Sequence, residues 1–266
     1  MPYFHSSDAE VYYEVLGTGQ PLVFSHGLGG SLEKVKEFVE DLPGIQAIVY
    51  DNRSHGQTRI RAGCALNFGS MAADMAALLD HLSLGSVFVG GVSMGAGIAL
   101  AFALQNGPRA RALILSRPAW LDKPHPENLE CTAVLADLID QHGIEGAGGA
   151  FRQTDCFRRV QSLSPAAAES LCGGLDGADP QALTAAYRAV PASAPVSSMD
   201  RLSELRVPAL VIGTQGDPIH PFFIAEEWAR RIPASRLAEL PSRYEDPAGH
   251  VQQFRRAVGE FLQTVQ

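Results

Sequence analysis

The sequence predicts an α/β protein in which helices cover both faces of a mostly parallel, doubly wound sheet. Short, continuously apolar runs alternate with segments of helical periodicity, and strands buried on both faces are typical of parallel sheets. Helices are expected over 33–42, 70–82 and 96–105. The runs expected to form buried strands are 21–25, 47–50, 87–92 and 112–116, with an antiparallel edge strand at 11–15.

This alternation is interrupted by a helix-rich stretch of about 80 residues. Residues 121–199 contain no strong strand run and show helical patterns near 128–142, 165–172 and 180–190. The sequence therefore predicts one α/β core, formed by residues 1–120 and 200–266, with a helical insertion at 121–199. In its second part, strands are expected at 209–213 and 237–240, and a helix at 251–265.

The composition is that of a folded, acidic protein. The chain has 266 residues, 46% of them hydrophobic, and a formal net charge of -8, so binding to nucleic acid is not expected. No apolar run is long enough to span a membrane, and the N-terminus lacks the pattern of a secretory signal. We therefore expect a cytoplasmic protein that acts on a small molecule, while no oligomeric state is indicated.

The four cysteines do not have the spacing of metal ligands. We expect them to be free thiols, and we expect neither a metal site nor a cofactor. These cysteines are Cys64, Cys131, Cys156 and Cys172.

The segment Gly91–Gly95 reads G-x-S-x-G and lies between a predicted buried strand and a predicted helix. This is the context of a nucleophilic serine, whose hydroxyl is exposed by a sharp, strained turn. Positions two residues away on either side crowd that turn, which explains Gly91 and Gly95. Ser93 is therefore the predicted nucleophile. The alternative is an ordinary glycine-rich turn of a doubly wound fold.

A glycine-rich loop, His26–Gly30, follows the first buried strand. An acyl-transfer enzyme needs N–H donors for the oxyanion of its tetrahedral intermediate. We expect these donors to be the backbone N–H groups of Leu28 and Met94. His26 is expected to brace the loop by hydrogen bonding, and the alternative is an ordinary glycine turn.

A serine hydroxyl needs a base, and the base needs an orienting carboxylate. Asp217 follows the predicted strand 209–213, where ligand chemistry gathers in open α/β sheets, and it is the predicted acid, with Asp246 as the weaker candidate. His250 follows the last predicted strand and is the predicted base. The alternative base is His220, but its place three residues after the acid favours a role in shaping that loop or lining the pocket.

Taken together, these motifs resemble the α/β-hydrolase superfamily. The segments that carry the resemblance are HGLGG at 26–30, DNRSHGQT at 51–58, GVSMG at 91–95, GDPIHP at 216–221 and the histidine at 250. The chain is similar to small capped esterases and lactonases, including enol-lactone and acyl-homoserine lactone hydrolases. The resemblance implies that 121–199 is a cap over the nucleophile and that Asp51 and Arg53 are structural. One departure is residues 241–249, which lengthen the run before His250.

The sequence thus predicts a serine hydrolase that cleaves a small carboxylic ester or lactone through an acyl-enzyme. The basic cluster Arg152, Arg158 and Arg159 is expected to be a solvated helix face, with binding of a substrate carboxylate as its alternative. Other readings of the same triad are C–C bond hydrolysis, cofactor-free perhydrolysis and thioester cleavage; a non-catalytic ligand-binding member of the fold is a further one. The predicted substrate-binding residues are Trp120, Phe151, Phe157 and His220.

Overall fold

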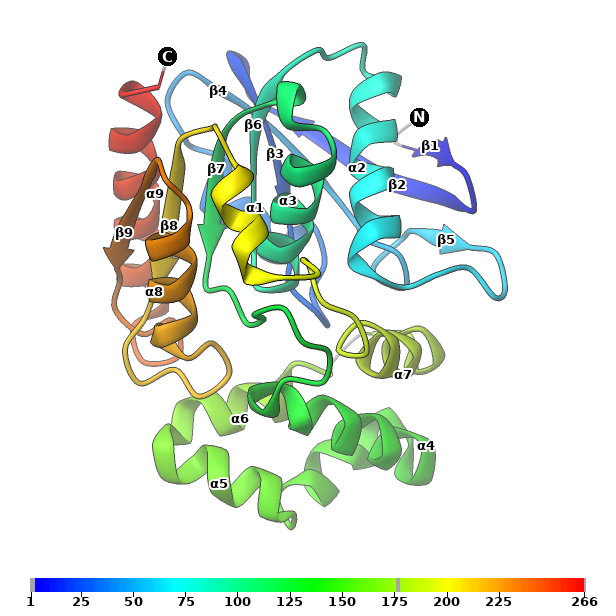
Figure 1. The fold of residues 1–266 in the computed structure, drawn as a ribbon. Helices are drawn as coiled ribbons and strands as arrows, with labels where there is room; N and C mark the ends of the chain where they lie inside the picture. The colour runs from blue at the N-terminus through cyan, green and yellow to red at the C-terminus, as the bar shows by residue number, and fades with distance from the viewer. Residues whose placement is uncertain (1–2, 176–177, 266) are drawn as a thin grey trace.

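The centre of the molecule is a mostly parallel sheet (Figure 1). The computed structural model describes residues 3–175 and 178–265, and within them nine strands run in the order β1-β2-β4-β3-β6-β7-β8-β9, with β5 paired to β2. The strands are β1 (Tyr3–Ser6), β2 (Ala9–Leu16), β3 (Gln20–Ser25), β4 (Ile45–Tyr50), β5 (Arg59–Ile60), β6 (Val87–Val92), β7 (Ala110–Ser116), β8 (Ala209–Gly213) and β9 (Ser235–Glu239).

The strands pair as the apolar runs predict. From β4 to β9 every neighbouring pair is parallel, whereas β2 pairs antiparallel with β1, β4 and β5. All six residues of β6 are buried, because a central parallel strand is covered on both faces. The predicted α/β sheet and the antiparallel strand expected at 11–15 are therefore confirmed. The prediction that this strand lies at the edge is wrong, because β1 pairs with β2 on the side away from β4. Neither β1 nor β5 was expected.

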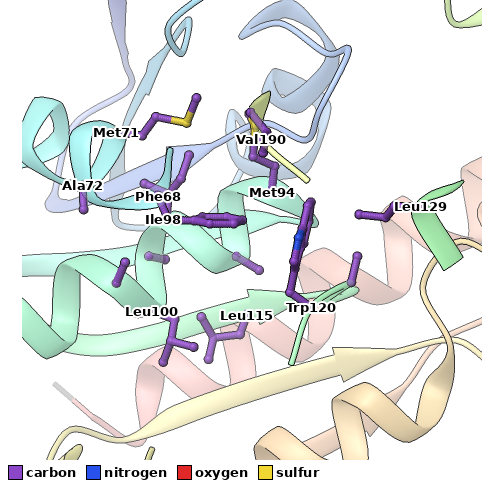
Figure 2. Close-up of a cluster of buried hydrophobic side chains, with 14 of the residues drawn as sticks. Phe68, Met71, Ala72, Met94, Ile98, Leu100, Leu115, Trp120, Leu129 and Val190 are labelled. Carbon is purple, nitrogen blue, oxygen red and sulfur yellow. The ribbon is translucent and has the colours of Figure 1, made fainter. Parts of the chain in front are cut away.

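Helices cover the two faces of this sheet. One face carries α2 (Phe68–His81), α3 (Met94–Gln105) and α8 (Phe222–Arg231), and the other carries α1 (Glu33–Val39) and α9 (Pro247–Gln263). Two apolar clusters result, one on each face. In the first, the indole of Trp120 lies edge-on to the ring of Phe68, at 5.1 Å between centroids, close to Ile98 and Met94 (Figure 2).

Among the described residues, four α-helices lie between β7 and β8 in the chain, across the end of the sheet at which β7 finishes (Figure 1). The helical stretches expected at 128–142, 165–172 and 180–190 are confirmed, and α5 was not foreseen. The first helix is kinked at Gly143, which has a φ of 70°. These helices are α4 (Glu130–Phe151), α5 (Asp155–Leu163), α6 (Pro165–Gly173) and α7 (Pro180–Ala189), and short 3-10 helices span Gly107–Arg109, Glu127–Leu129 and Met199–Glu204.

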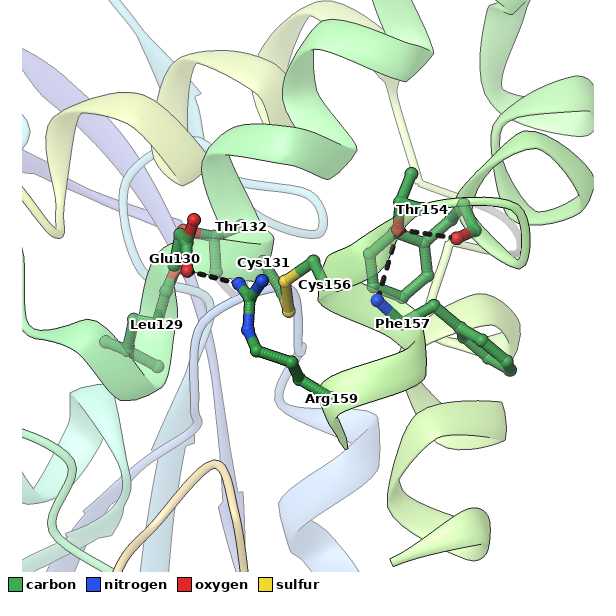
Figure 3. The surroundings of a disulfide bond; sticks show 9 residues. Leu129, Glu130, Cys131, Thr132, Thr154, Cys156, Phe157 and Arg159 are labelled. Carbon is green, nitrogen blue, oxygen red and sulfur yellow. Dashed lines mark hydrogen bonds and ion pairs between the residues drawn. A yellow bond between two sulfur atoms is a disulfide. The ribbon is translucent and has the colours of Figure 1, made fainter. Parts of the chain in front are cut away.

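Cys131 and Cys156 form a disulfide between the first turns of α4 and α5 (Figure 3). The prediction of free thiols is therefore wrong for this pair, and Cys64 and Cys172 are free. The two half-cystines are 25 residues apart in sequence, but the kink of α4 at Gly143 and the turn into α5 bring their Cα atoms to 5.9 Å. Disulfides are typical of oxidising compartments, which argues against the cytoplasmic location expected from the sequence.

Within the described ranges, no helix has the length and apolar character needed to cross a membrane.

Candidate active site

Ser93 lies on a strained turn between β6 and α3. Its φ is 56° and its ψ is -112°, a conformation that side-chain-bearing residues rarely adopt. A Cβ at position 91 would lie 2.4 Å from the backbone carbon of Gly95, and a Cβ at position 95 would lie 2.1 Å from Ser25 O. Both flanking glycines are therefore required by the close approach of the backbone, as the motif indicated.

The imidazole of His220 lies between Ser93 and Asp217. His220 Nε2 is 2.9 Å from Ser93 Oγ, and His220 Nδ1 is 3.0 Å from Asp217 Oδ2. The three residues are buried, with exposed fractions of 8% for Ser93, 5% for Asp217 and 6% for His220. This is the geometry of a nucleophile, a base and the carboxylate that orients the base.

The loop after β8 explains how Asp217 and His220, which are only three residues apart, come to face each other. Asp217 Oδ1 accepts hydrogen bonds from the backbone N–H groups of Ile219 and His220, at 2.9 and 3.0 Å. These two bonds close a tight turn, which folds the imidazole back over the other carboxylate oxygen. The short spacing, which disfavoured His220 at the sequence level, is the signal that identifies this turn.

The prediction that His250 is the base is contradicted by its position. His250 lies in the first turn of α9, buried, with Nδ1 2.8 Å from Pro241 O and its ring edge-on to Phe38. Asp246 caps this helix by accepting from the N–H of Gly249. Because the helix begins before His250, this histidine packs against α1 and does not reach Ser93.

The pKa values of the pair fit a neutral base beside an ionised acid. Burial lowers the pKa of His220 below its usual 6.5, although the charge of Asp217 partly opposes this shift. For Asp217, burial by itself would raise the pKa, but the charges of His220 and Arg117 and the hydrogen bonds from His220 hold it well below its usual range. The carboxylate is thus available to stabilise an imidazolium at neutral pH.

The loop after β3 passes beside the nucleophile. A Cβ at Gly27 would lie 3.4 Å from the Cβ of Ser93, Leu28 lines the same cavity as Ser93, and Met94 opens α3 directly after the nucleophile. His26 braces this loop, as expected, because its Nε2 accepts from the N–H of Asn52 at 2.9 Å.

A second histidine, which sequence reasoning missed, holds the same loop. His55 Nε2 accepts the N–H of Gly29 at 3.0 Å, and its ring lies edge-on to His26, at 4.9 Å between centroids. Burial lowers the pKa of His26 to about 4 and that of His55 to about 3. Both rings are therefore neutral acceptors at neutral pH.

Residues of the DNRSHGQT segment support this region, in line with the structural roles that the resemblance implied for Asp51 and Arg53. Asp51 accepts from the N–H groups of Leu32 and Gln57, both at 2.8 Å. Arg53 forms a buried ion pair with Asp74. Ser54 stands where the related motif has glycine and has a φ of 61°.

A cavity of about 610 Å³ opens above Ser93, a size that suits a small organic ligand. Its wall combines the sheet end with the insertion; the contributing insertion residues include Leu129, Thr132, Ser170 and Tyr187.

Three of the four predicted substrate-binding residues lie outside this wall. Trp120 is buried against Phe68. Phe151 and Phe157 pack on each other, at 5.7 Å between centroids, inside the helical insertion. The predictions for Phe151 and Phe157 were wrong because the helical insertion needs its own aromatic side chains as a core. The prediction for Trp120 was wrong because its indole packs against Phe68 of α2 in the core of the α/β domain. Of the four predicted substrate-binding residues, only His220 lines the cavity.

In the portion of the chain that the structure describes, no group of three His, Cys, Asp or Glu side chains is placed to hold a metal ion.

Comparison with known proteins supports the α/β-hydrolase fold. A family model described as the alpha/beta hydrolase fold matches residues 20–138. A thermophilic esterase from Thermogutta terrifontis is 28% identical, with a TM-score of 0.76 over 97% of this chain and 94% of that one. The enol-lactonase from Burkholderia xenovorans LB400 is 22% identical, with a TM-score of 0.78 over 98% of this chain and 100% of that one, and shares the fold.

Among curated proteins, the one named "Putative carbamate hydrolase RutD" from Azorhizobium caulinodans is 27% identical over 241 residues, which is 90% of this chain and 89% of that protein. The chain therefore has the α/β-hydrolase fold, and the resemblance to that superfamily expected from its motifs is confirmed. Its relatives support a hydrolase.

Proposed function

We propose that this protein is a serine hydrolase that cleaves a small carboxylic ester or lactone through an acyl-enzyme. The observation that carries the proposal is the chain of contacts from Ser93 Oγ to His220 Nε2, at 2.9 Å, and from His220 Nδ1 to Asp217 Oδ2, at 3.0 Å. In this proposal His220 is the base, in place of the His250 expected from the sequence.

The proposed reaction has two halves, acylation and deacylation, and His220 acts first as a base and then as an acid in each. His220 Nε2 takes the proton of Ser93 while Oγ attacks the carbonyl carbon, and the N–H groups of Leu28 and Met94 bind the resulting oxyanion. His220 then gives the proton to the leaving alcohol oxygen as its bond to the acyl carbon breaks. A water molecule, deprotonated by the same histidine, releases the acid and restores Ser93. Throughout, Asp217 stabilises the imidazolium.

We propose further that residues 121–199 act as a cap. Leu129 from the 3-10 helix Glu127–Leu129, Thr132 from the first turn of α4, Ser170 from α6 and Tyr187 from α7 close the cavity opposite the sheet end. Enclosure of this kind excludes water and shapes the acyl and alcohol sites.

A carbamate is the second candidate for the scissile bond, because the relative from Azorhizobium caulinodans carries a carbamate hydrolase name. The same nucleophile and oxyanion donors suit that carbonyl. C–C bond hydrolysis, perhydrolysis and thioester cleavage remain alternatives on the same triad.

The test is to replace Ser93 by alanine. We expect the unaltered protein to hydrolyse p-nitrophenyl butyrate and to be labelled at Ser93 by a fluorophosphonate, whereas Ser93→Ala does neither and keeps its circular dichroism spectrum. Ser162→Ala, an exposed serine on α5, serves as the control and keeps both properties. Labelling of another residue, or turnover by Ser93→Ala, would contradict the proposal.

A further inference from the structure

The cavity above Ser93 is positively charged although the chain as a whole is acidic. Its wall contains Lys34, Arg117 and Arg243 and one acidic residue, Glu37, while the formal net charge of the chain is -8. Positive charge gathered in a concave, partly desolvated site attracts anionic ligands.

Arg117 is a buried cation with too few partners. It follows β7, has an exposed fraction of 8% and a φ of 47°, which is a strained backbone for a residue with a side chain. Its Nη1 lies 3.8 Å from Asp217 Oδ2, and neither Nε nor Nη1 has a hydrogen-bond partner among residues 3–175 and 178–265. A buried guanidinium is costly unless its N–H groups are bonded, so this site lacks an acceptor.

Arg243, which also lines the cavity and directly precedes Tyr244 in the chain, repeats the pattern. Its Nη2 bonds to Glu37, while Nη1 is buried with no partner in the described part of the chain. The guanidinium carbon of Arg243 is 4.9 Å from the centroid of Phe38, and that of Arg117 is 5.4 Å from the centroid of Tyr244. Stacking on rings fixes the flat faces of both groups and leaves their N–H edges for a ligand.

The surface arginines of the insertion offer no comparable site. Arg152, Arg158 and Arg159 are exposed, and none of them lines the cavity. Their carboxylate partners are Glu169, Asp155 and Glu130, respectively. The expectation of a solvated face thus holds for this cluster.

We propose that Arg117 and Arg243 form a subsite that binds a carboxylate group of the substrate; this inference rests on the proposed function, since it defines which esters or lactones the Ser93 site selects. A planar carboxylate accepts charge-assisted hydrogen bonds from a guanidinium. It provides the acceptors that both arginines lack, inside the cavity that contains the nucleophile. The substrate class is an ester or lactone that also bears a free carboxylate.

The test uses two pairs of esters that differ only in whether a carboxylate is free. Mono-p-nitrophenyl glutarate and its methyl ester vary the acyl side, and 4-acetoxybenzoate and its methyl ester vary the leaving group. We expect kcat/KM to favour the free acid by about ten-fold or more in at least one pair. Because any effect of Arg117 on the triad acts on both members of a pair, the ratio within the pair reports the subsite alone.

Arg117→Met and Arg243→Met are each expected to reduce this ratio by about ten-fold, and Arg117→Lys to retain part of it. Arg159→Met, which removes an exposed arginine paired with Glu130, is the matched control and leaves the ratio unchanged. The subsite proposal would be overturned by a kcat/KM that is higher for the methyl esters. It would also be overturned by a preference for the free acids that persists in both methionine variants. Circular dichroism identifies a variant that does not fold. In that case the ratio measured for the methionine variant of the other arginine tests the proposal.

Calorimetric binding of glutarate and of benzoate to Ser93→Ala separates this inference from the proposed function. Carboxylate binding that is lost in Ser93→Ala/Arg243→Met supports the subsite even where no ester is cleaved. Normal ester hydrolysis with neither carboxylate binding nor a preference for the free acids overturns the subsite and leaves the Ser93 chemistry standing. Tighter binding of inorganic phosphate than of either carboxylate also overturns it.

Discussion

Replacing His220 by alanine removes the imidazole that lies 2.9 Å from Ser93 Oγ and 3.0 Å from Asp217 Oδ2. Without this base the serine keeps its proton, and we expect kcat for p-nitrophenyl butyrate to fall by a factor on the order of 10⁴ to 10⁶. Asp217 still accepts the backbone N–H groups of residues 219 and 220. The loss of the side-chain bond therefore destabilises the fold by only about 2 kcal/mol.

The decisive comparison is with His250→Gln. A glutamine amide keeps a donor for Pro241 O, which His250 Nδ1 now contacts at 2.8 Å, so kcat is expected to stay within about ten-fold of the unaltered protein. Initial rates of p-nitrophenolate release and fluorophosphonate labelling measure both variants, and thermal unfolding confirms that each is folded. A loss in His250→Gln as large as the loss expected for His220→Ala, or turnover by His220→Ala, would refute the assignment of the base.

Two further predictions concern pH and redox state. Since burial lowers the pKa of His220 and the base must be neutral, kcat/KM should stay high as pH falls to 6.5 and decline only below it; a midpoint at or above 6.5 contradicts this. The Cys131–Cys156 disulfide closes a separation of 25 residues and should stabilise the fold by about 3 kcal/mol, measured as a lower Tm after reduction. Thiol titration of the unfolded, unreduced chain should find two thiols; four would exclude the bond.

The part of the site that the sequence predicts well is the part formed by contiguous residues. The turn around Ser93 is specified by its own glycines, because the close contacts at positions 91 and 95 involve the backbone of the same turn and of the adjacent strand β3. The apolar runs likewise predict β6 and β8 at their observed bounds, since burial on both faces leaves a local signal.

The choice between the two histidines depended on the tertiary structure. His220 and His250 both follow late strands and both come after Asp217, and the short spacing between Asp217 and His220 favoured His250. Two backbone bonds to Asp217 Oδ1 turn His220 toward Ser93, while a helix cap at Asp246 carries His250 away from it. Both are interactions between residues close in sequence. Their effect, however, is to turn each histidine toward or away from Ser93, which is more than 100 residues from His220 in the chain.

By itself, then, the sequence determined the sheet, the helical insertion and Ser93, because each depends on local periodicity or on backbone crowding within one turn. Only the tertiary structure decided which histidine meets Ser93, which cysteines pair, and that Arg117 and Arg243 share a cavity with it. These are juxtapositions of segments far apart in the chain. They are set by how the loops after the strands and the helices of the insertion pack together. The spacing of residues along the sequence does not by itself indicate that packing.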